Sequence, residues 1–520
     1  MLRRVTLAAR WSAPLVLAVI LSAAGTGGPA GAADTVLTYA LISTGTSKIP
    51  AYTTTGEDTE IMAQIYDSVL QADAKTWKIG PDLATAYTTS SDGKTWTFTL
   101  RKGVKWQGGY GDFTCADVQF TWDFNKDPAN HSFWQTQAVI VDNVACPNPY
   151  TAEFHLSAPF QGFIWSVVNI EPSTGWVLCK AAWDKLGRAG YEKTPIGTGP
   201  YMLKSLAPSQ EVVLVRNPDY WGPKPAVDEI DFKVITDSQT AALAVKTGAV
   251  DIVGVNDPVV ATQYEHTPGV AVIAKQALRT DYLELNEMVK PFDDVKVRQA
   301  MRYAIDYRGL VAAILRGFGT PGYAGILMPG QTGFDPSVNP QNTYDPAKAR
   351  QLLKEAGVPL PIKGFFTTYN DTPDINAAQF LAANFAQVGI ELEARPLERG
   401  TLVQVRIAPT TPAAVIGNAL SPDPDGFIGA FTGKQIPPAG LNISRYTGAD
   451  QLFQMQREVA GAAARKRILR EIQQRFATDV PVIEYYVQKE IFFVNSRVHN
   501  YEPFVLFGGD PLAKVTLAAK

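Results

Sequence analysis

Few residues of this 520-residue chain have the types and the spacing that catalysis requires. Gly317 to Gly322 has the spelling of a dinucleotide-binding fingerprint, but it follows a predicted helix instead of a strand and carries a proline where a helix should begin. We interpret it as a helix-ending loop. Asp423 and Asp425 have the spacing of an acid/base pair, yet an Asp-Pro-Asp segment is more typical of a turn at the end of a strand. Neither segment predicts an active site.

Motifs for nucleophiles and metals are absent from the sequence as well. It contains no Walker A, HExxH or GxSxG segment, which excludes the P-loop ATPase, zinc-protease and serine-hydrolase templates. The histidines are scattered and predict no metal site; they are His131, His155, His266 and His499. We therefore expect no catalytic residue, no metal and no cofactor. An extracytoplasmic hydrolase that acts on a small solute is the alternative function.

The first 33 residues have the pattern of a secretory signal peptide. Arg3, Arg4 and Arg10 form a basic region, residues 13–23 an apolar core, and residues 30–32 a small-residue cleavage site. The apolar core is much shorter than the ~20 residues of a spanning helix, and no nearby cysteine could carry a lipid anchor. Cleavage removes three arginines and leaves 44 basic against 50 acidic residues, a balance that argues against nucleic acid as a partner. The sequence predicts a freely soluble periplasmic protein.

Cys115, Cys146 and Cys179 are the cysteines of the chain, and an odd number in an oxidising compartment suggests one disulfide and one free thiol. Cys115 begins a predicted helix, while Cys146 lies in the predicted turn between strands at 138–144 and 150–156. If both strands join the sheet under that helix, Cys115 and Cys146 can meet. Because spacing fixes no connectivity, three buried reduced cysteines are an equal alternative.

A turn, an alternating strand, a glycine loop and a capped helix follow one another after Asp92. Asp92 and Gly93 form a turn signal, and residues 95–100 alternate threonine with tryptophan, phenylalanine and leucine at the period of a half-buried strand. Thr114 and Asp117 then have the spacing of a capping box, which predicts the start of a helix.

The rest of the chain alternates helices with strands, the pattern of an α/β protein with mixed sheets. We predict a helix at 238–246 before a strand at 250–253, and a helix at 375–388 before a strand at 390–394. Between them, apolar residues at helical spacing predict one long helix over 294–316. The length exceeds what one core usually supports, so we expect two or three lobes.

Several segments, in the order required, resemble the signature of the extracytoplasmic solute-binding family 5, the dipeptide- and oligopeptide-binding proteins of bacterial ABC importers. The segments are PDLA (81–84), DGKTWTFTLRKGVKWQGGYGDFTCADV (92–118), IGTGPY (196–201), RNPDYW (216–221), PFDDVKVRQA (291–300), DPD (423–425) and DVPVI (479–483). One such segment would be weak, but their order makes chance agreement improbable. The resemblance implies a transport receptor, not an enzyme.

The resemblance also implies the architecture, an α/β type II periplasmic binding fold whose two lobes close on ligand about a hinge. Carried onto this sequence, lobe I takes residues 34–62, 196–280 and 489–520, with a subdomain inserted at 63–195, and lobe II takes 281–488. Ligand contacts both lobes only in the closed state. We expect a monomer that captures a small solute and delivers it to ABC permease subunits in the inner membrane.

Candidate ligand contacts lie in the loop after the first strand, in the glycine loop, near the hinge and in lobe II. They are Ser43, Thr44, Trp106, Tyr110, Tyr282, Asn286, Leu420, Asp423 and Arg445. For Ser43 and Thr44 the alternative is an ordinary polar turn. Arg445 has the chemistry to bind a carboxylate bidentately, and a solvated surface arginine is its alternative.

Leu420 marks a departure from the peptide-binding members of the family. In them an aspartate three residues ahead of an acidic-Pro dipeptide grips the free ammonium of the peptide. The dipeptide here is Asp423-Pro424, and Leu420 stands three residues ahead. A leucine cannot pair with an ammonium group. We therefore hypothesise a ligand without a free α-amino anchor there, such as a blocked peptide, an opine-like conjugate or a glycoside. A shifted alignment would give the anchor role to Asp423 or Asp425.

Overall fold

The computed structural model describes residues 35–518, apart from residues 54, 171–174, 256, 460 and 507–508. The signal peptide expected at residues 1–33 lies outside the described residues. Within them, no helix combines the length and the apolar character needed to cross a membrane.

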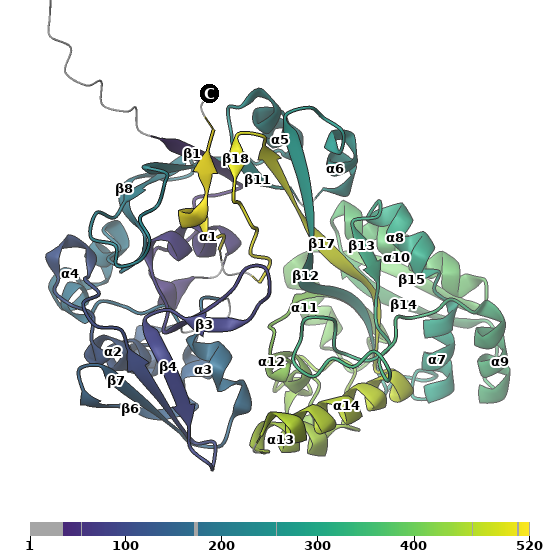
Figure 1. The fold of residues 1–520 in the computed structure, drawn as a ribbon. Helices are drawn as coiled ribbons and strands as arrows, with labels where there is room; N and C mark the ends of the chain where they lie inside the picture. The colour runs from purple at the N-terminus through teal and green to yellow at the C-terminus, as the bar shows by residue number, and fades with distance from the viewer. Residues whose placement is uncertain are drawn as a thin grey trace, which may run out of the picture. The chain divides into compact units, whose positions relative to one another are not determined.

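The largest element is an 11-stranded mixed sheet (Figure 1). Its strands follow the path β15-β14-β16-β12-β17-β11-β1-β10-β9-β8, and β13 pairs with β17 beside this path. The strands are β1 (Val36–Leu41), β8 (Tyr201–Ala207), β9 (Glu211–Arg216), β10 (Glu229–Val234), β11 (Ile252–Gly254), β12 (Val270–Leu285), β13 (Gly319–Pro321), β14 (Ile362–Tyr369), β15 (Ile390–Leu397), β16 (Ala413–Ala419) and β17 (Val482–Asn495).

Strands β12 and β17 join two halves of this sheet. They pair antiparallel from Val270 opposite Asn495 to Glu284 opposite Val482, and Figure 1 shows them side by side. We call β1 and β8–β11 the β1 half, and β14–β16 the β14 half. Each half contains a parallel trio, β10-β1-β11 in one and β15-β14-β16 in the other. The two halves therefore repeat one topology.

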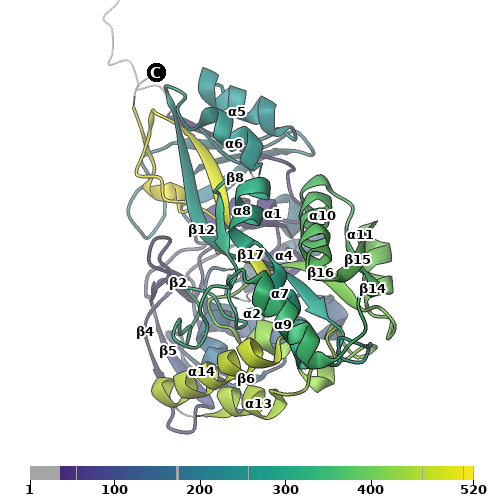
Figure 2. The same cartoon turned by 90° about the vertical axis from the view of Figure 1, so that its right-hand side faces the viewer.

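Helices pack on both halves, and Figure 2 shows α7 beside α9 in the β14 half. Many begin at an aspartate whose side chain accepts a backbone N–H, as Asp237 does for α5 and Asp294 for α7. The helices are α1 (Gly56–Ile65), α5 (Ser238–Thr247), α6 (Pro258–Tyr264), α7 (Val295–Ala304), α8 (Tyr307–Ile314), α9 (Pro346–Ala356), α10 (Thr372–Ala386), α11 (Arg399–Arg406), α12 (Asp425–Gly429), α13 (Asp450–Glu458) and α14 (Ala462–Asp479).

A second, four-stranded antiparallel sheet has the order β4-β5-β7-β6. Trp96, Phe98 and Leu100 of β5 are buried, as the alternation of that strand predicts. With its helices it forms what we call the four-stranded subdomain: β4 (Ala84–Thr89), β5 (Thr95–Leu100), α2 (Cys115–Lys126), α3 (Gln135–Ala138), β6 (Val141–Asn148), β7 (Thr151–Leu156), the 3-10 helix η4 (Gln161–Val167) and α4 (Lys180–Lys193). The hairpin β2 (Leu70–Ala72) and β3 (Ile79–Pro81) precedes it, and β18 (Val498–His499) pairs with β19 (Thr516–Leu517) near the C-terminus.

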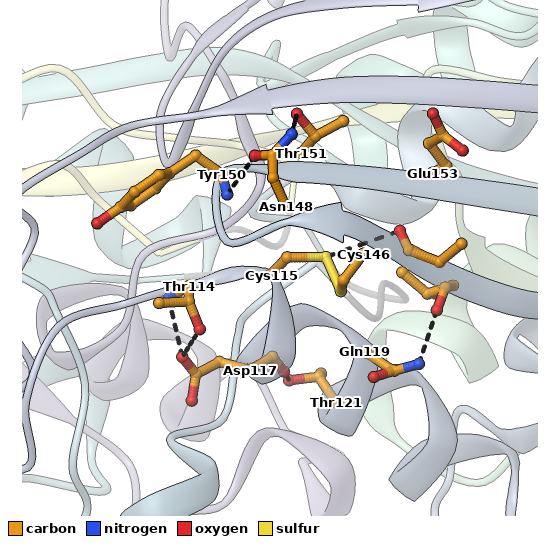
Figure 3. The surroundings of a disulfide bond; sticks show 12 residues. Thr114, Cys115, Asp117, Gln119, Thr121, Cys146, Asn148, Tyr150, Thr151 and Glu153 are labelled. Carbon is orange, nitrogen blue, oxygen red and sulfur yellow. Dashed lines mark hydrogen bonds between the residues drawn. A yellow bond between two sulfur atoms is a disulfide. The ribbon is translucent and has the colours of Figure 1, made fainter.

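A disulfide joins Cys115, the first residue of α2, to Cys146 in β6 (Figure 3). The capping box of Thr114 and Asp117 is present at the start of α2. The expectation that Cys146 lies in a turn is wrong, because β6 continues to Asn148 and the chain reverses only after that residue. Cys179 is a buried free cysteine whose pKa is raised by burial to about 12.

The single helix expected over 294–316 is also wrong, since α7 ends at Ala304 and α8 begins at Tyr307. Ile305 has extended backbone angles, and the side chain of Asp306 accepts the N–H of Gly309 and so caps a new helix. The segment 317–322, expected as a loop, contains strand β13. Gly319 permits this pairing, because a Cβ there would lie 2.8 Å from the carbonyl oxygen of Val487 in β17.

Candidate functional site

The sheet topology marks where a ligand can bind. In open α/β sheets, ligands bind outside the carboxyl ends of the strands at the point where the strand order reverses. The order reverses twice here, between β1 and β11 and between β14 and β16. Because β11 pairs with β17 and β16 pairs with β12, both reversal points adjoin the two strands that join the halves. The topology therefore indicates a cleft at β12 and β17 with one wall from each half.

A cavity of about 220 Å³ lies at the carboxyl ends of β1 and β11. Its lining includes Ile42, Gly254 and the carboxyl groups of Glu60, Glu490 and Asp510. These carboxyl groups differ in their surroundings. The side chain of Asp510 accepts from the hydroxyls of Tyr39 and Tyr501 and from the N–H of Phe504, and Glu60 accepts the N–H of Asp510. Among the described residues, no hydrogen-bond donor reaches the carboxyl group of Glu490.

Glu490 belongs to a set of polar residues on the two central strands and the adjoining end of α10. We call this set the hinge cluster: Arg279 and Asp281 of β12, Gln488 and Glu490 of β17, and Asp374 of α10. Nε2 of Gln488 donates to Oδ2 of Asp281 at 2.7 Å. The cluster contains more acidic than basic groups.

Burial raises the pKa values of the acidic members of the hinge cluster. It raises the pKa of Asp281 to about 6, against the opposing effect of the Arg279 guanidinium. The pKa of Asp374 rises to about 7 through burial and the charge of Asp281. The pKa of Glu490 also rises to about 7, through burial and then the charge of Asp510. Ionised, these groups are poorly solvated, so the cluster can bind a solute that supplies charge or hydrogen bonds.

A second cavity, of about 250 Å³, lies between the four-stranded subdomain and the loop that follows β16. Phe160, Gly162 and Trp165 line it from η4 and its flank, and Ser421, Asp423, Asp425 and Arg457 line it from the other side. Both oxygens of Asp423 are occupied, because Arg465 donates to them at 2.5 and 2.7 Å. Asp423 thus serves an internal ion pair in this structure.

The outer edge of β16 is largely unpaired. Strand β14 pairs with it at a single position, Thr367 opposite Ala414, so among the described residues the stretch from Val415 to Ala419 has no strand neighbour on that side. An unpaired edge exposes backbone N–H and C=O groups to which an extended peptide can add as a further strand.

The predicted ligand contacts that precede residue 120 interact with other residues of the protein. Oγ of Ser43 accepts the N–H of Gly45, and Oγ1 of Thr44 accepts the N–H of Ser209. Trp106 is buried and donates to Asp117. The ring of Tyr110 lies 5.4 Å from the ammonium group of Lys185.

The remaining predicted contacts lie at opposite ends of the β12–β16 pair. Asn286 and Arg445 both donate to carbonyls of residues 407–411, near the start of β16. Tyr282 is buried against the rings of Phe427 and Phe431. Leu420 lies at the other end, 4% exposed, and its N–H donates to the carbonyl of Leu278. The structure therefore does not gather the predicted residues into one site.

Sequence reasoning missed the hinge cluster, although its signal was present. Arg279, Asp281 and Glu490 are charged residues inside strands that also contribute many apolar side chains to the cores, and a charged residue in such a strand requires a partner or a function. Their proximity depends on the pairing of β12 with β17, whose residues stand more than 200 positions apart, as the 207 positions between Asp281 and Gln488 show.

The first four signature segments converge elsewhere, around Asp67 at the end of α1. Oδ2 of Asp67 accepts two hydrogen bonds, one from the hydroxyl of Thr198 at 2.9 Å and one from Nε1 of Trp221 at 2.7 Å. Arg101 lies 4.3 Å from the ring centre of Trp221 and donates to the carbonyl of Asp82. We call these five residues the signature network. It joins the four-stranded subdomain to β8 and β9, so its role is structural.

Among the described residues, no group of three or more histidine, cysteine or acidic side chains is placed to hold a metal ion. The arrangement at the hinge is that of a polar binding cleft.

Comparisons with known proteins agree with this geometry. Residues 78–437 match bacterial extracellular solute-binding proteins, family 5 Middle. The glutathione-binding protein GsiB of Escherichia coli strain K12 is 31% identical over 437 residues, which cover 80% of this chain and 82% of GsiB. The peptide-bound DppA of Helicobacter pylori is 27% identical with a TM-score of 0.74, covering 93% of this chain and 98% of DppA.

The HbpA2 structure from Haemophilus parasuis superposes with a TM-score of 0.84 at 23% identity, over 93% of this chain and 100% of HbpA2, and supports the fold alone. The fold is the two-lobe type II periplasmic binding fold. The extent of the family match and the identity to GsiB together place this chain in family 5 of the bacterial extracellular solute-binding proteins, as a solute-binding receptor of an ABC importer and not an enzyme.

Proposed function

We propose that this receptor captures a small peptide or peptide-like solute between its lobes and delivers it to permease subunits in the inner membrane. The observation that carries the proposal is the pair of strand-order reversals at β1/β11 and β14/β16, which face the same two central strands. Among the relatives named above, GsiB is a glutathione-binding protein, and the DppA structure contains the peptide STSA.

The lobes of this proposal take residues 34–62, 196–280 and 489–520 for lobe I and 281–488 for lobe II, with 63–195 inserted. The distribution of buried side chains supports the division. One apolar core lies under the β14 half and another lies under β1 and the four-stranded subdomain, while β12 and β17 contribute side chains to both. A strand pair that passes from one core to the other is suited to act as a hinge.

The unpaired edge of β16 supports a peptide-like backbone in the ligand. A solute with amide N–H and C=O groups can hydrogen-bond to Val415 through Ala419, and the backbone bonds alone would not select a sequence. Side-chain specificity would then come from the cavity at the carboxyl ends of β1 and β11 and from the hinge cluster.

Leu420 supports a ligand without a free α-amino group at the end of this edge. It is buried and apolar, and the nearest alternative anchor, Asp423, already binds Arg465 through both oxygens. An ammonium group at this point would lose its hydration without gaining a carboxylate partner. Blocked peptides, opine-like conjugates and glycosides avoid this penalty.

Titration calorimetry tests the ligand class. The panel contains di- to pentapeptides and reduced glutathione, each with its N-acetylated form, on protein first unfolded and refolded to remove retained solute. We expect the blocked forms to bind at least tenfold more tightly than the free forms. Micromolar binding of free peptides that is lost in Asp423→Asn and unchanged in Leu420→Ala would show instead an ordinary peptide receptor anchored at Asp423.

Export and association state are tested separately. We propose cleavage of a signal peptide near residue 33 and a monomeric mature protein. N-terminal sequencing of protein released by osmotic shock is expected to begin at Ala33 or Asp34, and light scattering is expected to give the mass of one chain. A sequence that starts at Met1 contradicts the cleavage proposal.

A further inference from the structure

Two glycines lie where the β14 half and its helices contact parts of the chain that precede β8. A Cβ built on Gly162 of η4 would lie 2.7 Å from Cε2 of Phe160 and 2.9 Å from Oδ1 of Asp423, and a Cβ on Gly330 would lie 2.0 Å from Cζ3 of Trp77. Real Cβ atoms do not approach other atoms so closely without displacement. Both contacts therefore require glycine as the residues now stand.

The surface that meets Gly162 is rigid. Arg465 holds Asp423 through two hydrogen bonds, and the N–H of Asp425 donates to Oδ1 of Asp423 at 3.0 Å. Gln456 accepts from Arg465 at 2.8 and 2.9 Å and donates to Asp425 at 2.5 Å. Asp423 and Arg465 are 6% and 4% exposed, so neither can turn away easily. Steric pressure from a larger residue at 162 would act on Asp423 across the contact and on the ring of Phe160 in its own segment.

An aromatic contact lies beside this one. The guanidinium carbon of Arg457 lies 5.1 Å from the ring centre of Phe160, within cation–π range. Nε of Arg457 also lies 3.2 Å from Oδ1 of Asp425, which orients the guanidinium group. Phe160 directly precedes η4 and Arg457 belongs to α13, so the contact again links the four-stranded subdomain to the β14 side.

We propose that the Gly162–Asp423, Phe160–Arg457 and Trp77–Gly330 contacts form a latch that stabilises the closed lobes in the absence of ligand. The latch goes beyond the proposed function, although it rests on the two-lobe closure described there. Opening the cleft must separate these pairs, none of which belongs to the hinge cluster. The residues that precede β8 then help to set the balance between open and closed states.

The latch predicts how the apparent dissociation constant should change. When only the closed state binds tightly, the apparent dissociation constant equals the intrinsic one divided by the closed fraction. Weakening the latch should therefore weaken every ligand by the same factor. A residue that contacts the ligand would instead change the ranking of different ligands.

Distance measurements on the ligand-free protein test the latch without knowledge of the ligand. Lys94→Cys on the four-stranded subdomain and Lys466→Cys on α14 place spin labels at exposed positions, while the buried Cys179 and the disulfide remain unlabelled. Double electron–electron resonance then reports the short, closed distance and the long, open one in protein refolded free of solute.

Gly162→Ala is the test variant, because Gly162 has no positive φ and the added methyl group crowds two members of the latch, Asp423 and Phe160. Gly426→Ala is the matched control, since Gly426 lines the same cavity and a Cβ there meets nothing within 4 Å. We expect the closed population to fall at least threefold in Gly162→Ala and to stay unchanged in Gly426→Ala. Phe160→Leu, which keeps an apolar side chain, should lower it about twofold, and it serves as the test if Gly162→Ala fails to fold.

Equal distance distributions in the parent, Gly162→Ala and Phe160→Leu proteins would overturn the latch, as would a parent protein without any closed population before ligand is added. Because no ligand is present, failure of the peptide panel above leaves this result unaffected. A normal shift to the closed distance with ligand, combined with no effect of the variants, would retain the proposed function and remove the latch.

Discussion

The signature network and the hinge cluster both contain buried carboxyl groups whose pKa values are raised, but they use these groups differently. In the signature network, Oδ2 of Asp67 accepts hydrogen bonds from two side-chain donors of the network itself. In the hinge cluster, Glu490 has no donor among the described residues, although burial raises its pKa to about 7. A carboxyl group that is held by internal donors stabilises one arrangement, whereas a carboxyl group without a protein donor leaves capacity for a solute.

The difference explains what the family resemblance can and cannot tell. Its signature segments supply Asp82, Arg101, Thr198 and Trp221 to the network, and the contacts of these residues lie within the scaffold. None of the first four segments reaches the hinge cluster. The resemblance is therefore strongest in residues that maintain the scaffold. The residues that bind the ligand must be sought outside the signature segments.

Loss of the disulfide in the subdomain that carries the signature should give the largest effect on stability. The Cys115→Ala/Cys146→Ala variant removes a cross-link between residues 31 positions apart, and its free energy of unfolding should fall by about 3 to 4 kcal/mol. Guanidinium unfolding measures this loss, with Cys179→Ala as the control. Peptide mapping without reductant that finds Cys179 paired, or three free thiols, would refute the pairing. Ligand affinity should not change, because the hinge cluster is untouched.

Truncation of a side chain inside the signature network should give the second-largest loss of stability. Asp67→Ala leaves Nε1 of Trp221 and Oγ1 of Thr198 without their acceptor, and we expect a loss of about 2 to 3 kcal/mol in unfolding free energy. Asp67→Asn retains a carbonyl acceptor and should lose clearly less. Folded Asp67→Ala protein should bind its solute as the parent does. A tenfold loss of affinity at unchanged stability would place Asp67 in the binding site and break the comparison.

Neutralising Glu490 in the hinge cluster should raise the free energy of unfolding, whereas the two variants above lower it. The folded-state pKa of Glu490 lies above its ordinary value, so the folded protein holds this proton more tightly and loses stability as the pH rises from about 4.5 to about 7. Glu490→Gln removes that dependence. At pH 8 the variant should be more stable by about 1 to 2 kcal/mol, and at pH 4 the two proteins should be nearly equal.

Urea unfolding at both pH values measures the effect of Glu490→Gln. A variant that is less stable at pH 8 would mean that the ionised carboxylate has a stabilising partner, and the hinge would then resemble the signature network. A variant that is more stable but binds solute more weakly would sharpen the contrast between the two regions, since the same carboxylate would oppose folding and favour binding.

The smallest effect is expected at the loop after β1. Thr44→Val removes the hydroxyl that accepts the N–H of Ser209, which should lower stability by about 0.5 to 1 kcal/mol. Solute affinity should stay within a factor of two. If affinity instead falls at least tenfold while stability holds, Thr44 binds the ligand and the cleft extends further along lobe I than the two strand-order reversals indicate.

Local signals in the sequence predicted much of the fold. The capping box at Thr114 and the helix predicted at 238–246 both appear where expected, and that helix, α5, is capped by Asp237 and ends at Gly248. The break at Ile305 was missed because apolar residues keep their helical spacing across it, and only the cap at Asp306 reveals it. Periodicity records which face is buried, and it does not record whether the helix is continuous.

The candidate site was less accessible to sequence reasoning. Ser43, Thr44 and Trp106 are residues of the types that line clefts. Each, however, is hydrogen-bonded to a nearby backbone N–H group or carboxylate. Arg279 and Glu490 come together only through strands formed by distant parts of the chain. Such proximity arises from topology, and a single sequence contains no local signal for it.

The long strand β17 also governs how the chain can fold. Residues 482–495 pair with β11, β12 and β13, so one late segment completes the sheet on both sides of the hinge. Until that segment is available, β11 lacks one of its two neighbouring strands, and β12 lacks its partner along most of its length. Neither lobe can finish folding while synthesis is still in progress, and folding must wait for the C-terminal part of the chain. A protein that has to cross a membrane before it acts gains time in the unfolded state from that delay.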